Sequence, residues 1–349
     1  MEDKKMTKQF YGYGVVRRRG EKHLDVYFPK IHSIKEIPSG LPANSFVALA
    51  DLSEEIQQSL PCSYKDLLNG IDYKSGYSEC SVGVFSLSVL DTPVDSVAHG
   101  YFKLQLLSQR SVKPHELNLD ALFGNLHNIA WTNKGPVLIE DVESERIKSY
   151  STENVLEISH VDKFPYMVNY HVPEGTRIAS GSQVRLGAHL GKGTTVMPAG
   201  YINFNAGTEG NAMIEGRVSA GVFVGNDSDV GGGASIMGTL SGGNKDVISI
   251  GQQCLLGANA GAGISLGTGC TIAAGLYVYA GMKVSLYNED DNPIDIEGNL
   301  VDEPSNIVKA KELSGRDFLL FIQDSISGKV ICKPNKKTIE LNTQLHQND

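Results

Sequence analysis

Aliphatic residues recur at every sixth position through the middle of the chain. The runs are Ile178, Val184, Leu190, Val196 and Ile202, then Val218, Val224, Val230 and Ile236, and last Cys254, Ala260, Leu266, Ile272, Val278 and Val284. An α-helix repeats its apolar side chains every 3.6 residues and a strand every two. A six-residue period is typical of a β-helix, in which each unit supplies one short strand and one corner. We therefore predict a triangular prism of stacked coils, left-handed as such hexad coils usually are, over residues 166–287.

Two segments break this period, residues 203–217 and residues 239–249. We expect both to be loops that leave the prism. Loops held by a rigid scaffold often carry binding and catalytic residues. The two breaks are therefore the first places to search for chemistry.

The segments that flank the prism have ordinary patterns. Residues 1–165 predict an α/β N-terminal domain, with strands at 46–50 and 82–90, helices at 97–108 and 118–123, and Trp131 in its core. Residues 288–349 predict a small C-terminal subdomain whose apolar run, 318–322, packs on the last coils. The expected fold class is an α/β domain, a left-handed parallel β-helix and a C-terminal subdomain.

Glycine changes this picture only at the corners of the coils. Of 38 glycines, 25 lie between Gly175 and Val284, and several directly follow a periodic aliphatic. A flexible linker would not keep its aliphatics in register. The clusters at 231–238 and 261–267 resemble dinucleotide-binding fingerprints loosely, but neither opens a helix after a strand. We therefore assign these glycines to tight corners.

Charge and cysteine content exclude several classes of protein. The net charge of −9 argues against a nucleic-acid-binding protein, and no run approaches the roughly 18 apolar residues of a membrane span. No apolar stretch follows the charged N-terminus, so we expect no signal peptide.

The five cysteines form no metal-binding or disulfide pattern, which favours reduced thiols in the cytoplasm. The acidic run 288–295 lacks the ligand spacing of a calcium loop, and we expect it to be solvated.

Glu215 and Arg217 are the most distinctive polar residues, since they flank Gly216 where the period resumes. If this segment is extended, residues two apart face the same side and the two charges share one surface. The spacing alone leaves two alternatives open, a surface ion pair and a functional site.

Longer blocks of sequence resemble one family. They are Val184–Leu190, Gly193–Met197, Asn203–Gly207, Glu215–Arg217, Gly231–Gly243, Val247–Gly251, Cys254–Asn259, Gly263–Gly267 and Ala274–Val278 in the prism, with Val112–His115, Leu117–Asp120, Ala130–Asn133 and Glu312–Gly315 outside it. Over about residues 95 to 345 the chain is similar to the longer class of tetrahydrodipicolinate N-succinyltransferases, which are hexapeptide-repeat acyltransferases. The resemblance implies transfer of a succinyl group from succinyl-CoA to the amine of open-chain amino-oxopimelate, a small dicarboxylate, in lysine biosynthesis.

The resemblance also implies roles for particular residues. Glu215 matches the family's catalytic carboxylate, which acts either as a nucleophile that forms an acyl anhydride or as a general base. Arg217 matches a ligand contact whose fork suits a carboxylate. The remaining positions that match substrate or acyl-CoA contacts are Gly232, Ser235, Ala258, Ala273, Ala274, Gly281, Lys309 and Ser325.

Further implications concern assembly and metal. The family assembles as homotrimers, with the site at the cleft between subunits, and can hold magnesium on the trimer axis. The matching positions here are Ser182 and Ala199, neither of which suits a metal, so we predict no metal site and no cofactor. The family's Arg-Arg-Asn-Ser is Ile322-Gln-Asp-Ser325 in this chain. This departure leaves open a divergent N-acyltransferase with another acyl donor or amine, and a non-catalytic β-helix scaffold is the alternative from a different class.

Overall fold

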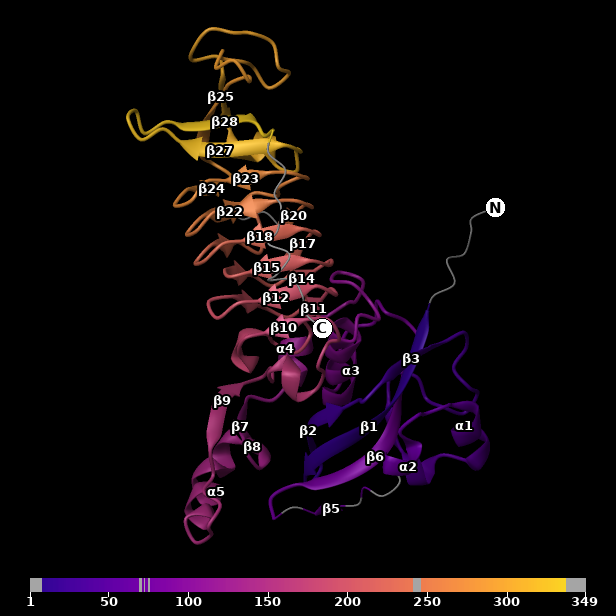
Figure 1. The fold of residues 1–349 in the computed structure, drawn as a ribbon. Helices are drawn as coiled ribbons and strands as arrows, with labels where there is room; N and C mark the ends of the chain where they lie inside the picture. The colour runs from indigo at the N-terminus through magenta and orange to yellow at the C-terminus, as the bar shows by residue number, and fades with distance from the viewer. Residues whose placement is uncertain (1–7, 69–70, 72, 75, 241–245, 337–349) are drawn as a thin grey trace, which may run out of the picture. The chain divides into compact units, whose positions relative to one another are not determined.

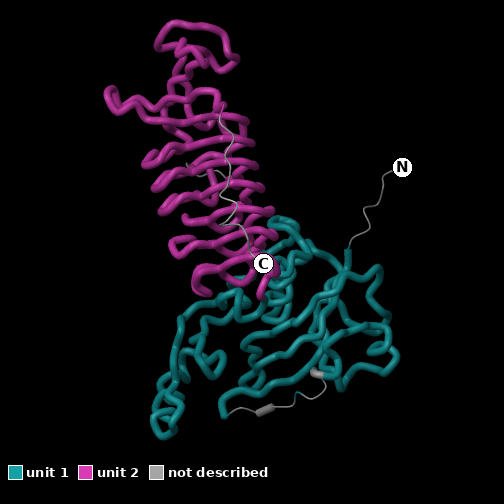
Figure 2. The backbone as a smooth tube through the Cα atoms, viewed as in Figure 1, with its two compact units in different colours: residues 1–171 teal, residues 172–349 magenta. Residues whose placement is uncertain are grey.

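The computed structural model describes residues 8–68, 71, 73–74, 76–240 and 246–336. The chain separates into two compact units, residues 1–171 and residues 172–349 (Figure 2). The predicted division into three domains, at residues 165 and 287, stays a prediction.

The first unit is built on an antiparallel sheet. Strand β1 (Gln9–Arg19) lies at its centre and pairs with β2 (Lys22–Tyr27), β3 (Ile31–Ile34) and β6 (Glu79–Leu87). Strands β4 (Phe46–Ala48) and β5 (Tyr73–Lys74) pair with β6. The predicted strands at 46–50 and 82–90 are thus confirmed with shifted ends. Two short helices, α1 (Glu54–Ser59) and α2 (Lys65–Leu68), lie between β4 and β5 in the chain.

Helix α3 (Val97–Ser108) has the bounds that the sequence predicts, with Ser96 as its N-cap. Its residues from Ala98 onward are all buried, and the Gln105 side chain bonds to Phe28 N (2.9 Å) and Val26 O (2.8 Å) at the end of β2. Buried amide groups need such partners, so Gln105 fixes the helix against the sheet. The helix predicted at 118–123 is wrong in position, because α4 spans Leu122–Asn125 and Asn118 instead accepts from Asp120 N in a local turn.

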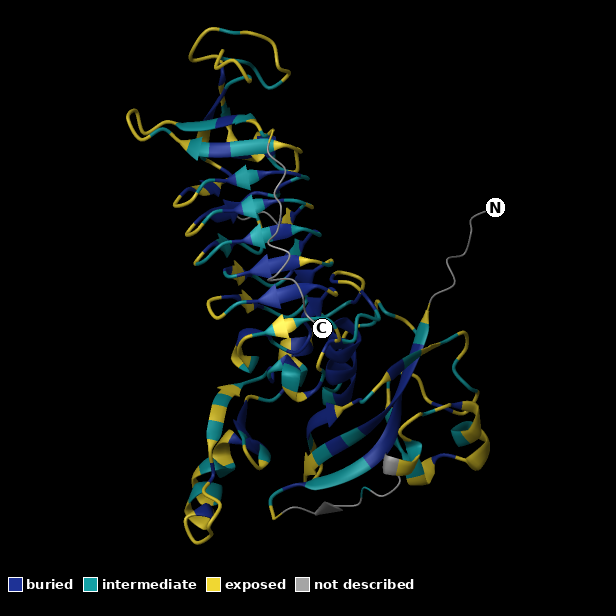
Figure 3. Ribbon diagram, in the orientation of Figure 1, coloured by how far each residue is buried: buried dark blue, intermediate teal, exposed yellow. Residues whose placement is uncertain are grey.

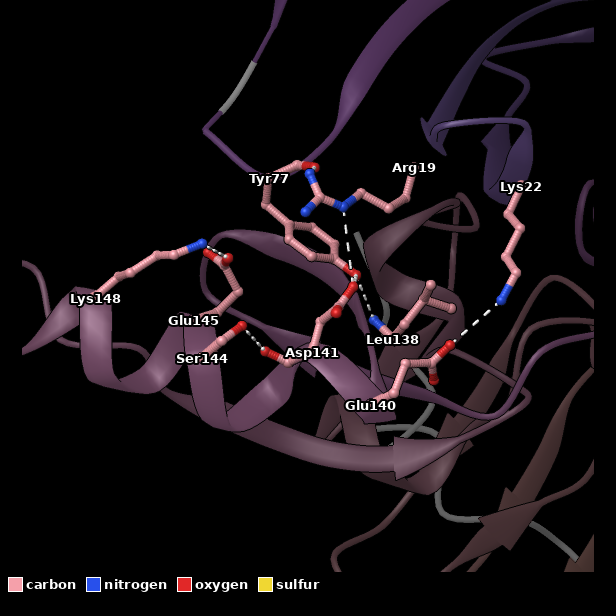
Figure 4. A network of polar contacts seen from close by, with 9 residues as sticks. All are labelled: Arg19, Lys22, Tyr77, Leu138, Glu140, Asp141, Ser144, Glu145 and Lys148. Carbon is pink, nitrogen blue, oxygen red and sulfur yellow. Dashed lines mark hydrogen bonds and ion pairs between the residues drawn. The ribbon is translucent and has the colours of Figure 1, made fainter.

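A three-stranded sheet completes the first unit, made by β7 (Ile129–Thr132), β8 (Gly135–Leu138) and β9 (Ile158–Asp162). Trp131 of β7 is 5% exposed and donates to Asp162 O, which confirms its predicted place in the core. Helix α5 (Val142–Ser149) follows β8. Figure 4 shows Tyr77 bonded to Asp141 and Leu138 beside this helix, with Arg19 stacked on its ring. Burial, with Asp141 nearby, raises the pKa of Tyr77 to about 12.

The second unit is a stack of coils with three flat faces, seen as parallel rungs in Figure 1. The first face contains β10 (Arg177–Ile178), β12 (Thr194–Val196), β15 (Ala212–Ile214), β18 (Ser228–Val230), β21 (Leu255–Leu256) and β23 (Thr271–Ile272). The second face contains β13 (Tyr201–Ile202), β16 (Arg217–Val218), β19 (Ser235–Ile236), β22 (Gly261–Gly263) and β24 (Tyr277–Tyr279). The third face contains β11 (His189–Leu190), β14 (Gly207–Thr208), β17 (Phe223–Val224) and β20 (Ser249–Ile250).

Parallel pairing puts like positions of successive coils in columns. On the first face Val196 pairs with Ile214, Ile214 with Val230, and Val230 with Leu256. These side chains are at most 1% exposed, whereas many corner residues are exposed (Figure 3). The inward columns confirm the prism that the hexads predict.

The expectation that residues 203–217 form a loop outside the prism is wrong. Thr208 occupies the third face and Ile214 the first face, and both are fully buried. Thr208 replaces an aliphatic by bonding to Thr194 Oγ1 at 2.6 Å inside the coil. The hexad count then resumes at Val218 because the corner between Ile214 and Val218 is two residues short. Residues 239–249 do leave the period, with Thr239 bridged to Val247, and residues 241–245 lie outside the described residues.

The C-terminal residues extend the first face rather than forming a separate layer. Strand β27 (Leu319–Gln323) pairs with β23 and with β28 (Val330–Pro334), and β25 (Lys283–Leu286) pairs with β28 and β26 (Ile307–Lys309). The predicted packing of the apolar run 318–322 on the last coils is therefore confirmed. The acidic run 288–295 makes turns at the surface.

A substitution at Ile214 tests whether residues 203–217 belong to the prism. We expect Ile214→Ala to lower the free energy of unfolding by about 2–4 kcal/mol, because it leaves a cavity in a fully buried column. Urea denaturation followed by circular dichroism measures this, with Val172→Ala, at a 76% exposed position, as the control that changes little. An equally small effect at both positions would contradict the buried placement and would indicate that Ile214 lies in a surface loop.

Candidate active site

One corner of the prism, the turn from the first face to the second, collects four of the ten predicted site residues. Successive coils contribute Glu215, Gly232, Ala258 and Ala274 to this corner. Backbone hydrogen bonds connect them, from Gly233 N to Glu215 O (3.2 Å), from Asn259 N to Gly232 O (2.9 Å) and from Gly275 N to Ala258 O (2.9 Å). We call this row the small-residue corner, since every side chain beyond Glu215 is hydrogen or methyl.

Glu215 is held at the lower end of this corner. It follows the buried Ile214 at the end of β15, and its amide donates to Val230 O at 2.8 Å. A Cβ atom on Gly232 would lie 3.5 Å from Glu215 Oε2, so the carboxylate rests against the bare backbone of the next coil. The side chain is half-buried, which leaves the carboxylate accessible to a ligand along the corner.

Arg217 lies on the far side of the turn, at the start of β16 on the second face. It is exposed, and its Cα partners are Tyr201 below and Ser235 above. The segment is not extended as one strand, because the chain bends at Gly216 between β15 and β16, so the condition for Glu215 and Arg217 to share one side is not met. No ion pair joins Glu215 and Arg217 among the described residues.

Gly216 and Gly232 have different physical reasons to be glycine. A Cβ on Gly216 would meet Ala234 O at 2.3 Å, a distance that real Cβ atoms do not show. A Cβ on Gly232 would make only ordinary contact. The fold therefore requires glycine at position 216. At position 232 the absence of a side chain leaves open surface beside Glu215.

The other predicted residues lie higher in the unit. Ala273 donates its amide to Phe321 O (2.9 Å), and Gly281 follows Ala280, whose carbonyl accepts from Lys311 N (3.1 Å). Lys309 ends β26 and is exposed. Ser325 lies in the hairpin turn between β27 and β28, where Asp324 accepts from Ile326 N and Ser327 N. Among the described residues, Ser325 has no hydrogen bond that ties its side chain to the small-residue corner.

Three exposed tyrosines on the face that carries Arg217 were missed in the sequence, and one of them, Tyr201, is the Cα partner of Arg217. Tyr201, Tyr277 and Tyr279 are 38–54% exposed on the second face. A Cβ on Gly261 would lie 2.1 Å from the Tyr277 ring, so this ring covers the glycine between itself and Ser235. A pattern in the sequence could have found two of them. Outward positions of the second face directly precede its inward residues, and these positions are 201, 217, 235, 261 and 277. The pattern can be recognised only once the lengths of the corners are known.

A separate cavity of about 470 Å³ lies in the first unit, beside the residues of Figure 4. Its lysines are already engaged, Lys148 with Glu145 (2.7 Å) and Lys134 with Asn154 O (2.7 Å). It therefore offers little free charge to an ionic ligand.

No metal cluster is visible in the part of the chain that the structure describes. Ser182 Oγ lies 3.0 Å from Ser180 Oγ. The predicted absence of a metal at Ser182 and Ala199 stays a prediction. No described helix has the length and apolar character needed to cross a membrane.

Comparison with known proteins gives consistent matches. Residues 126–166 match a family described as tetrahydrodipicolinate N-succinyltransferase middle, and residues 247–280 match a hexapeptide repeat of succinyl-transferase. The 2,3,4,5-tetrahydropyridine-2,6-dicarboxylate N-succinyltransferase of Vibrio cholerae is 55% identical over 259 residues, which are 74% of this chain and 72% of the relative. The protein of the same name from Pseudomonas aeruginosa is 50% identical over 263 residues, 75% of this chain and 73% of the relative.

A solved structure from Campylobacter jejuni, provisionally named a 2,3,4,5-tetrahydropyridine-2-carboxylate N-succinyltransferase, has a similar fold. It has a TM-score of 0.77 and 32% identity, and the match covers 97% of this chain and 96% of that one. The matches confirm the predicted fold class, an α/β N-terminal domain followed by a left-handed parallel β-helix and a small C-terminal subdomain.

The two glycines of the site provide a matched test of this geometry. We expect Gly216→Ala to lower the free energy of unfolding by more than about 2 kcal/mol, because the added methyl overlaps a carbonyl of the next coil. Gly232→Ala is expected to change it by less than about 0.5 kcal/mol. Chemical denaturation of both variants measures this difference. A Gly232→Ala variant as unstable as Gly216→Ala would mean that this glycine serves the fold rather than the site.

Proposed function

The chain belongs to the tetrahydrodipicolinate N-succinyltransferase family, and from this premise we propose that Glu215 is its catalytic carboxylate and the small-residue corner its acyl-CoA groove. The enzyme transfers the succinyl group of succinyl-CoA to the amino group of L-2-amino-6-oxopimelate, which forms from tetrahydrodipicolinate, in the diaminopimelate pathway to lysine. The observation that carries the site assignment is the place of the Glu215 carboxylate, whose Oε2 would lie 3.5 Å from a Cβ added to Gly232 on the next coil.

The reaction makes one bond and breaks one. The amine nitrogen forms an amide with the succinyl carbonyl carbon, the carbon–sulfur bond of the thioester breaks, and the nitrogen loses a proton. Glu215 can promote this acyl transfer in one of two ways. As a general base it accepts the proton of the amine, and as a nucleophile it first displaces the CoA thiolate to give a mixed anhydride that the amine then opens.

The neighbours of Glu215 suit the proposed substrates. A pantetheine arm is long and flexible, and a row of hydrogen and methyl side chains at Gly232, Ala258 and Ala274 lets it approach the backbone closely. Arg217 carries a planar, always charged fork for a substrate carboxylate, and no partner among the described residues occupies that fork. Ser235, the Cα partner of Arg217 on the next coil, adds a hydroxyl group next to it on the second face.

Glu215→Gln is the direct test of the catalytic role. We expect kcat to fall by a factor of about 10³ or more, because the amide neither accepts a proton nor attacks a thioester. The melting temperature is expected to stay nearly constant, since the Glu215 side chain makes no hydrogen bond or ion pair with another described residue. Release of CoA from succinyl-CoA in the presence of tetrahydrodipicolinate measures the rate.

Glu209→Gln is the matched control, because Glu209 is an exposed carboxylate on a coil whose described partner is Gln252 (3.0 Å). Activity above a few per cent in Glu215→Gln would contradict the assignment. Rapid quenching of the native enzyme separates the two roles, since a succinyl adduct trapped on Glu215 supports the anhydride route and its absence supports the general base.

We further propose that the enzyme is a cytoplasmic homotrimer. All five cysteines are free thiols, in accord with a reducing compartment. The exposed tyrosines Tyr201, Tyr277 and Tyr279 give the second face an apolar character that suits contact with another subunit.

Sedimentation equilibrium of the 37.7 kDa chain tests the assembly and is expected to give three times the chain mass. If the site is shared between subunits, mixed trimers of inactive Glu215→Gln and inactive Arg217→Ala chains are expected to regain part of the activity. A monomer with full activity would rule out a shared site.

A further inference from the structure

Two lysines face each other on neighbouring antiparallel strands at the C-terminal end of the coils. Lys283 of β25 is the direct Cα partner of Lys309 of β26. The bond from Ala310 N to Met282 O (2.8 Å) identifies this as a non-hydrogen-bonded pair. In such pairs the Cα atoms are only about 4.5 Å apart and the two side chains project from the same side of the sheet. The two ammonium groups therefore share one patch of surface.

This arrangement is unfavourable in the protein alone. Like charges directly opposite each other on antiparallel strands destabilise the pair. Both lysines are exposed, and neither has an ion-pair partner among the described residues. Glu312, the nearest acid in sequence, accepts a hydrogen bond from the Lys309 backbone amide at 3.0 Å. An anion bound between the two ammonium groups would remove the repulsion.

The lysine pair lies beside Gly281, one of the positions that the resemblance assigns to substrate or acyl-CoA contact. Lys283 is two residues after Gly281, and the strand that carries Lys309 leads into Lys311, whose amide bonds to Ala280 O (3.1 Å). The backbone around Gly281 is thus bonded directly to the segment that follows Lys309. A ligand that contacts Gly281 therefore lies close to the backbone segments that carry Lys283 and Lys309.

We propose that Lys283, together with Lys309, binds the terminal phosphate of acyl-CoA, the phosphomonoester on its ribose. This inference rests on the proposed acyl-CoA groove and adds Lys283 to it. A phosphomonoester carries close to two negative charges and three acceptor oxygens, and so matches two ammonium donors better than a diphosphate oxygen or a single carboxylate does. Lys283 acts in binding, and it has no part in the chemical step.

Calorimetry with two probes tests the proposal on the full chain. CoA carries the terminal phosphate and 3′-dephospho-CoA lacks it. We expect Lys283→Ala to weaken CoA binding about 10-fold, since it removes one charge-assisted contact, and to leave dephospho-CoA binding unchanged. Equal CoA affinity in the native protein and in Lys283→Ala would overturn the proposal, and so would an equal loss with both probes.

Kinetics and a matched variant complete the test. In Lys283→Ala we expect the KM for succinyl-CoA to rise about 10-fold with kcat within a factor of two and the KM for the amine unchanged. A rise in the KM for the amine alone would assign Lys283 to the dicarboxylate and overturn the proposal. Lys192→Ala, at an exposed lysine already paired with Glu174 (3.6 Å), is the control and is expected to change neither constant.

The proposal and the proposed function fail in different ways. If the native protein binds CoA through Lys283 but transfers no succinyl group, the function is wrong and the phosphate site stands. If it transfers succinyl groups and Lys283→Ala is indistinguishable from it in both assays, only the phosphate site is wrong. The melting temperature of the ligand-free variant is expected to be equal or higher, because the substitution removes a repulsion, and a lower value would indicate a structural role.

Discussion

Each coil of the second unit must pair its backbone with the coils above and below at the same three places. This parallel pairing is the constraint on which the rest of the structure depends. It sets the rise between coils at about 4.8 Å. It also stacks each inward side chain on the inward side chains at the same position of the neighbouring coils. Ile214, Val230 and Leu256 form one such column, and each is fully buried. Corners are free to vary in length, because the strands on either side stay in register whatever lies between them.

The site follows from this constraint. Glu215 lies beside Gly232 because Ile214 and Val230 are paired, which puts the residues that follow each of them at the same corner, where Gly233 N donates to Glu215 O. Arg217 and Ser235 are adjacent on the next face for the same reason. The proposed carboxylate and its row of small residues therefore lie at one corner, and Arg217 begins the face that follows it, without any loop that has to fold over them. A site built in this way is rigid, which keeps reacting groups aligned.

Much of this was predictable from the sequence, and the errors have a common cause. The spacing of Val218, Val224 and Val230 predicted the prism, and the bounds of helix α3 followed from the helix-like run 97–108. Residues 203–217 were misread as a loop because Thr208 is polar and the corner after Ile214 is short. A buried threonine bonded to another threonine satisfies the interior as an aliphatic does, and a fixed count of six cannot detect it. The opposed lysines were invisible for a related reason, since the pairing of Lys283 with Lys309 depends on how a segment of more than twenty residues returns to the sheet.

The measurement that tests the central claim most directly is a crystal structure of the Glu215→Gln variant with succinyl-CoA bound. We predict that the thioester carbonyl lies within about 3.5 Å of the residue 215 side chain, a distance typical of a reactive approach, and that the pantetheine arm lies along Gly232, Ala258 and Ala274. A succinyl group bound on another face of the prism, or a structure in which residues 207–214 lie outside the coils, would contradict it.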